Sequence, residues 1–198
     1  MRWLGLLLAT MLVAACATGG ASGASVNASM PRRPRIGLIH ETKDKFTSAT
    51  TQYTENEGLD GGGLASARVS ISFSRVFGQS GRTAFCTIGM TYQWHTWMFI
   101  ERSRSLMLKA GDSTFTLQPL AAPSRDVVSG GVIEHAAYPV TLREIDRLVD
   151  ARSVDLRLVG SKWNEDRSLS TKARERLDAF RSLVVSDSSH ACLQVPPT

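Results

Sequence analysis

Two neighbouring segments of the chain alternate between apolar and small polar residues, and this pattern restricts the fold more than any other feature. In residues 68–76, Val69, Ile71 and Phe73 alternate with serines. Residues 83–94 repeat the alternation, and the sequence Gly-Gln-Ser-Gly lies between the two runs. A period of two with one polar face is typical of a half-buried β-strand. Two such runs about a glycine-rich turn predict an antiparallel hairpin.

Shorter apolar runs on either side of this hairpin extend the predicted sheet. Glycine and proline interrupt the chain in residues 55–63 and 120–131, which we interpret as loops. The alternation in residues 132–138 predicts the last strand of a meander. The remaining short strands are expected at residues 36–39, 49–53, 97–101, 106–109 and 114–117.

The last third of the chain predicts a helix, a strand and a second helix. Thr141 and Glu144 have the spacing of a capping box, so a helix is expected from Thr141 to about Ala151. Residues 154–158 alternate again, and Ser170 is a good N-cap for an amphipathic helix. Strands that precede helices favour an α+β fold, in which an antiparallel β-meander sheet is followed by helix–strand–helix and the helices pack on one face.

The first fifteen residues predict export. Arg2 precedes an apolar run over residues 3–15. A helix of that length spans about 20 Å, which is too short for a hydrocarbon core of ~30 Å. Residues 1–15 therefore predict a signal peptide rather than a membrane span.

The apolar run ends in Val13-Ala14-Ala15-Cys16, which resembles the lipobox of bacterial lipoproteins. The resemblance implies that Cys16 is diacylated on its sulfur, becomes the mature N-terminus and is then N-acylated. Acyl chains hold a protein to a bilayer because each buried CH₂ contributes ~0.8 kcal/mol. Ala17 follows where an aspartate would imply retention, so the resemblance also implies an outer-membrane anchor facing the periplasm. The alternative is an ordinary signal peptide with an incidental cysteine.

The charge of the chain is concentrated near its N-terminus. Formal net charge is +5, and four of the 23 basic residues lie within the first 35 positions. The other basic residues nearly balance the 18 acidic ones, so the body has no basic face for a phosphate backbone, and we expect no nucleic-acid partner. Small polar residues predict a flexible tether after the cysteine that the resemblance implies is lipidated, and the two together span residues 16–35. We expect a single domain over residues 36–186 and a polar tail over 187–198.

Several motifs of the last third occur together. They are the strand end Tyr138-Pro139 after Glu134, a capped helix, the strand end Leu156-Arg157-Leu158-Val159-Gly160, and Phe180 in the closing helix. Together they resemble domains of uncharacterised bacterial secreted proteins and lipoproteins. Because these are packing and capping motifs, the resemblance implies no activity.

Two cysteines remain after Cys16 is assigned to lipidation. Cys86 lies on the apolar face of its predicted strand, and Cys192 lies in the tail. An even pair in an oxidising compartment predicts a disulfide. It would close a loop of about 107 residues and contribute about 4–5 kcal/mol in the chain-entropy model. The alternative is a buried free thiol and a second, loose one.

The motif Trp94-His95-Thr96-Trp97 lies at a predicted strand junction. Two tryptophans beside a histidine favour a stacking platform for a sugar or a peptide, because tryptophan combines an apolar face with one donor. We therefore take Trp94, His95 and Trp97 as candidate ligand-binding residues. The alternative places both tryptophans in the core and edge of the sheet, and the alternation puts Trp94 on the apolar face.

The sequence contains no recognisable catalytic motif. Gly-x-Ser-x-Gly is absent, and the four histidines do not have metal-ligand spacing. We therefore predict no catalytic residue, no metal and no cofactor.

Together these features predict a lipid-anchored envelope lipoprotein that binds another envelope component, either a protein or a cell-wall glycan. One alternative is an anchored hydrolase whose site is assembled from distant residues such as His95, Glu134 and His135. The other is a carrier of small ligands. An enzyme or a carrier needs a concave pocket with convergent polar groups, whereas a binding module needs only an exposed apolar patch.

Overall fold

The computed structural model describes residues 38–62, 66–77, 83–187 and 192. The chain divides into two units, residues 1–30 and 31–198, and all of the described residues belong to the second. The predicted signal peptide, Cys16, the arginines of the tether and the glycine-rich turn at 78–81 lie outside the described residues.

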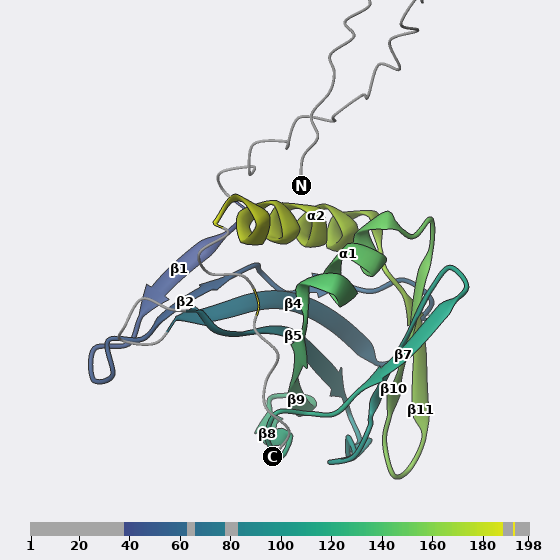
Figure 1. The fold of residues 1–198 in the computed structure, drawn as a ribbon. Coiled ribbons are helices and arrows are strands. Elements are labelled where there is room, and N and C mark those ends of the chain that lie inside the picture. Colours follow the sequence, from purple (N-terminus) through teal and green to yellow (C-terminus); the bar gives the residue numbers. More distant parts are fainter. Residues whose placement is uncertain (1–37, 63–65, 78–82, 188–191, 193–198) are drawn as a thin grey trace, which may run out of the picture. The chain divides into compact units, whose positions relative to one another are not determined.

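Most strands form one large antiparallel sheet (Figure 1). Its order is β1-β2-β4-β5-β9-β8, and a two-residue strand, β3, also pairs with β4. The predicted hairpin forms its centre, because β4 and β5 pair from Arg68 with Gln93 to Phe77 with Thr83. The strands are β1 (His40–Lys43), β2 (Thr50–Tyr53), β3 (Glu57–Gly58), β4 (Arg68–Phe77), β5 (Thr83–Trp94), β8 (Ser124–Val128) and β9 (Gly131–Val140).

The other strands form a separate antiparallel sheet of four strands, in the order β11-β10-β6-β7. Its members are β6 (Leu106–Ala110), β7 (Ser113–Leu117), β10 (Val154–Val159) and β11 (Asn164–Ser168). The chain enters this sheet from β5, returns to the large sheet for β8 and β9, and enters it again after the first helix. The strand predicted between the two helices therefore belongs to the small sheet.

The predicted α+β architecture is wrong. The described residues are mostly β, with 49% of them in strands and 18% in helices, and they form curled antiparallel sheets rather than one sheet with helices packed on a face. Two missed strands explain much of the difference. β8 lies within the predicted 120–131 loop, and β11 reads Asn-Glu-Asp-Arg-Ser, without apolar alternation. A cross-strand charge pair stabilises β11 in place of apolar contacts, since Arg157 of β10 binds Asp166 of β11 through two hydrogen bonds of 2.6 and 2.7 Å.

Three smaller predictions also need correction. Of the strand predicted at 36–39, residues 36 and 37 lie outside the described residues, residues 38 and 39 form no strand, and the first described strand is His40–Lys43. Residues 97–101 form no strand, and only Ile100 makes an isolated bridge, to Gly160. The predicted loop 55–63 contains β3. The other predicted strands are present to within a few residues at each end.

Both helices begin where their caps predict. The first, α1 (Leu142–Asp150), has the complete capping box of Thr141 and Glu144. The second, α2 (Thr171–Ser186), begins after Ser170, whose hydroxyl accepts a hydrogen bond from the Ala173 amide. Neither helix of the described chain is long and apolar enough to cross a bilayer.

The core joins both sheets and both helices. Phe180 of α2 stacks on Phe73 of β4 with 6.0 Å between ring centroids. Leu106, Leu108 and Leu158 of the small sheet are fully buried in the same apolar cluster. The predicted disulfide is confirmed, with Cys86 bonded to Cys192 and 5.2 Å between their Cα atoms.

Candidate binding surface at the aromatic loop

Residues 95–101, here called the aromatic loop, follow β5 where the chain leaves the large sheet for the small one. The loop contains two of the three candidate ligand-binding residues, His95 and Trp97, and the third, Trp94, ends β5. His95 is exposed, and its ring lies 4.3 Å from the Trp94 ring between centroids.

The two tryptophans occupy different environments. Trp94 is half-buried and packs against the core cluster. Trp97 is also half-buried, but within the described chain its recorded ring contact is with Phe99, at 6.2 Å between centroids. Trp94 therefore fits the structural alternative, and Trp97 is the better candidate for binding.

A buried carboxylate fixes the aromatic loop to the large sheet. Glu134 lies on the core face of β9 with no exposed surface. Its carboxylate accepts backbone N–H groups from Met98, Phe99 and Ile100 at 2.7, 2.8 and 2.8 Å. Arg125 of β8 donates a fourth hydrogen bond, at 3.3 Å. A buried charge is strongly unfavourable unless it is compensated in this way.

The backbone that Glu134 holds is strained. Phe99 has φ +58°, the left-handed region that a bulky side chain rarely adopts. Such a conformation costs about 1–3 kcal/mol and persists only where the surroundings enforce it. Here the three N–H bonds to Glu134 enforce it from one side.

The small sheet holds the loop from the other side. The Ser161 amide donates to the Phe99 carbonyl at 3.0 Å, and the Glu101 amide donates to the Val159 carbonyl at 3.2 Å. Gly160 makes this approach possible, because a Cβ there would lie 2.4 Å from Met98 Cγ and 2.6 Å from the Met98 carbonyl. The aromatic loop is therefore fixed between the two sheets.

Two cations complete the surface. The Arg125 guanidinium lies 5.1 Å from the centroid of the Phe99 ring, and Lys162 Nζ lies 5.4 Å from it. Both distances suit cation–π attraction. We call Trp97, Phe99, Arg125 and Lys162 the aromatic surface. It combines apolar rings with positive charge, which suits a partner that has flat apolar faces and acidic groups.

The residues of the hydrolase alternative do not converge. Glu134 faces the core, whereas His135 is exposed on the opposite face of β9. His135 Nδ1 lies 2.9 Å from Thr91 Oγ1, on the face of the sheet opposite to the Glu134 carboxylate. Among the described residues, no group of three or more His, Cys, Asp or Glu side chains could hold a metal ion.

A groove of about 400 Å³ lies on the outer face of the small sheet. Lys109, Asp155, Arg157 and Asp166 are among the side chains that line it. Hydrogen bonds from Arg157 lower the pKa of the Asp166 carboxyl, and Asp155 accepts the Ser168 hydroxyl at 2.6 Å. Much of the groove's charge is thus already paired.

Sequence reasoning missed Phe99, Arg125, Lys162 and the role of Glu134. One signal was available for Glu134, because it occupies a core position in the alternation of β9, between Val132 and Ala136. A carboxylate at an apolar position needs several donors, and this points to a neighbouring segment that supplies them. Comparison with protein-family models, with curated proteins and with solved structures finds no match.

Proposed function

We propose that this protein is a lipoprotein of the bacterial cell envelope whose folded domain binds another envelope component through the aromatic surface. The observation that carries the proposal is the rigid presentation of Trp97 and Phe99 on a strained loop fixed by Glu134. Aromatic side chains held in one geometry lose little entropy on binding and are common binding hot spots.

The anchor belongs to the same proposal. Acylation of Cys16 would hold the domain at the membrane, facing the periplasm from the outer membrane. The partner is then a neighbouring envelope protein or a cell-wall glycan. Lys162 beside the Phe99 ring favours a partner that carries acidic groups, since the charge of Arg125 already compensates Glu134.

A carrier of small ligands is the second candidate, and the groove on the small sheet favours it. Its volume of about 400 Å³ falls within the range of small-molecule sites. The Arg157–Asp166 pair argues against it, since a ligand would have to compete with two short hydrogen bonds.

In-cell photo-crosslinking tests the proposal. A photoreactive phenylalanine analogue replaces Trp97 in the full-length chain, and the same analogue at Lys109, exposed on the outer face of the small sheet, is the matched control. We expect Trp97 to capture one specific envelope protein or glycan fragment that Lys109 does not capture. A Cys16→Ala chain is expected to stay soluble and to lose the product. Equal capture from both positions would contradict the aromatic surface, and capture from Lys109 alone would favour the carrier.

A further inference from the structure

The turn between β1 and β2 is unusually well fixed for an exposed hairpin tip. Asp44 Oδ1 accepts hydrogen bonds from the Phe46 amide, the Thr47 amide and the Thr47 hydroxyl at 2.9, 2.7 and 2.9 Å. These bonds lower the pKa of the Asp44 carboxyl, led by the Thr47 amide. Ser48 closes the turn with φ +55°, a left-handed conformation. The tip is therefore held in one shape.

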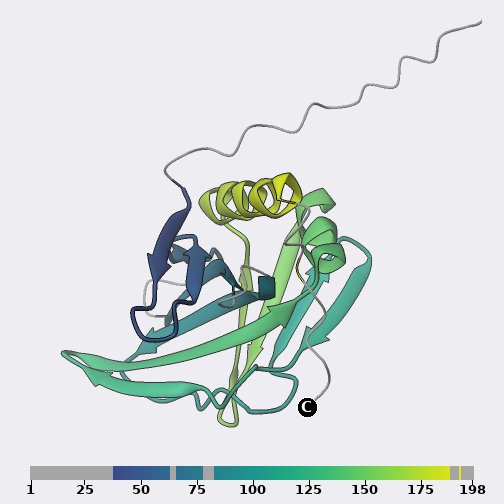
Figure 2. The same ribbon diagram turned by 60° about the vertical axis from the view of Figure 1, so that its left-hand side comes forward.

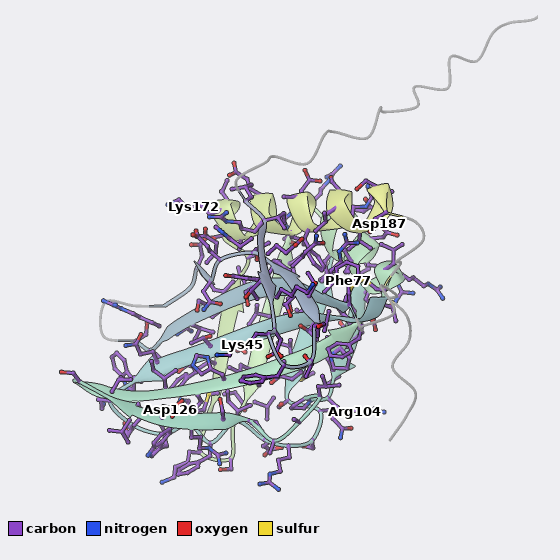
Figure 3. The ribbon with its side chains drawn as sticks, turned by 90° about the vertical axis from the view of Figure 1, so that its left-hand side faces the viewer. Lys45, Phe77, Arg104, Asp126, Lys172 and Asp187 are labelled. Atoms are coloured by element: carbon purple, nitrogen blue, oxygen red, sulfur yellow. A yellow bond between two sulfur atoms is a disulfide. The ribbon has the colours of Figure 1, made fainter. Side chains whose placement is uncertain are left out.

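This fixed tip presents an aromatic ring to solvent. Phe46 is 82% exposed, more than any other large apolar side chain described. Lys43 and Lys45 flank the turn, and Lys45 Nζ lies 4.9 Å from the Phe46 centroid. Glu41, the nearby acidic residue of β1, accepts a hydrogen bond from Gln52 at 2.7 Å. Figure 3 labels Lys45 on this hairpin.

We propose that the β1–β2 tip is a membrane-contact site, in which Phe46 enters the interface of an anionic bilayer while Lys43 and Lys45 contact lipid phosphates. An aromatic ring beside flexible lysines is the side-chain pairing found at membrane interfaces, where the ring is buried and the ammonium groups stay at headgroup level. Each lysine near an anionic surface adds favourable electrostatic free energy.

The placement of the hairpin in the chain supports a lipid surface as the partner. β1 begins at His40, soon after the segment expected to link the fold to Cys16. Residues 17–35, as a flexible tether, would reach roughly 25 Å. The four residues of β1 add about 13 Å, so in a chain anchored at Cys16 the tip would come within reach of the bilayer. The inference rests on the proposed anchoring of Cys16, which would bring the β1–β2 tip close to the bilayer.

A second hairpin tip provides an internal control. Val127, near the β8–β9 turn, is 80% exposed, close to the value for Phe46. Its neighbour in sequence is Asp126, labelled in Figure 3, instead of a lysine. The two tips lie at opposite ends of β5, because Thr50 pairs with Phe77 at one end and Trp94 pairs with Val132 at the other. A bilayer that contacts one tip therefore need not contact the other.

Tryptophan fluorescence in vesicles tests the site. Full-length protein, as processed by the cell, carries Phe46→Trp or Val127→Trp, and the emission of the parent protein is subtracted. Each is added to vesicles of phosphatidylglycerol and brominated phosphatidylcholine, and flotation measures anchoring separately. We expect strong quenching of the Phe46→Trp signal and little quenching of Val127→Trp. In the Phe46→Trp protein, the further substitutions Lys43→Ser and Lys45→Ser are expected to lower the ratio of inserted to free tip by at least about fivefold.

The outcomes separate the two proposals. Flotation with no more quenching at position 46 than at 127 would overturn the membrane-contact site and leave the anchor intact. Absence of both flotation and quenching would overturn the site together with the anchor.

Discussion

Two charged side chains, Arg75 and Glu134, are buried on the core face of the large sheet and differ in how they are compensated. Glu134 has no exposed surface and accepts four hydrogen bonds. Arg75 is 2% exposed, and its Nε and Nη2 donate to Gln52 and Asp187. Within the described chain, its Nη1 has no hydrogen-bond partner. Burial, the largest cause, lowers the pKa of the Arg75 guanidinium.

The two ends of the sheet are therefore stabilised by different means. Arg75 is the cross-strand partner of Cys86, so a covalent bond lies directly beside it. Glu134 lies opposite Tyr92, near the other end of β5, and there its carboxylate attaches the aromatic loop to the large sheet. Figure 2 gives a second view of the long β8–β9 hairpin at this end. We infer that Glu134 is needed for the shape of the binding surface, whereas Arg75 is replaceable.

Loss of the disulfide should have the largest effect on stability. The bond joins residues separated by 106 positions. Cys86→Ala with Cys192→Ala should lower the free energy of unfolding by about 4–5 kcal/mol in the chain-entropy model. Urea unfolding of the double variant, with Cys16 unchanged, measures this. A loss below about 1 kcal/mol would show that the bond contributes little at this end of the sheet.

Glu134→Gln should have the next largest effect. The side chain keeps its size, but one acceptor oxygen becomes an NH₂ group that faces backbone N–H donors. We expect a loss of about 2–3 kcal/mol and faster hydrogen exchange at the amides of Met98, Phe99 and Ile100. Unchanged exchange at these amides would contradict the role given to Glu134.

A buried tyrosine of β9, Tyr138, should make stability depend on alkaline pH. Burial raises the pKa of Tyr138 from about 10 to about 12, partly opposed by its hydrogen bond with the Ser105 hydroxyl. The unfolded chain therefore loses this proton at lower pH than the folded one. The contribution of Tyr138 to the free energy of unfolding is therefore fully present below pH ~10. It should fall by about 2 kcal/mol as the pH rises from ~10 to ~12. Urea unfolding across this range, against Tyr138→Phe, measures it; an equal decline in both proteins would refute the assignment.

Arg75→Met should have the smallest effect. Methionine fills the apolar volume of the arginine stem and removes a donor that has no partner, while Asp187 stays partly exposed. Replacement of an imperfectly compensated buried charge by an apolar residue is often neutral, so we expect a change within about 1 kcal/mol. Thermal unfolding of Arg75→Met, Glu134→Gln and the parent protein under the same conditions measures this change. A loss equal to that of Glu134→Gln would remove the contrast between the two ends.

Local patterns predicted the elements better than their arrangement. The serine alternation of β4 and the caps at Thr141 and Ser170 depend on neighbouring residues, and they appear as expected. β11 was missed because its support comes from pairing with β10 across a turn, through charged residues that resemble a loop in sequence. The division into two sheets depends on partners far apart in the chain, which periodicity does not specify.

The candidate site was predictable only in part. The Trp94–Trp97 motif identified the right segment, because tryptophans beside a histidine are conspicuous in any sequence. Which tryptophan packs against the core depends on where β5 ends and on the direction in which Glu134 holds the chain. Phe99 gave no signal, since its left-handed backbone results from contacts with both sheets.

The most direct test of the account measures stability and partner capture together in Trp97→Ala. If the aromatic surface binds an envelope component, the free energy of unfolding should change by less than about 1 kcal/mol, because Trp97 does not support the core. In-cell crosslinking from a photoreactive phenylalanine analogue at Phe99, in the full-length chain, should then lose its specific product in Trp97→Ala, while Lys109→Ala retains it. A loss of several kcal/mol on unfolding, or an unchanged product, would show that Trp97 is a structural residue and would contradict the proposed surface.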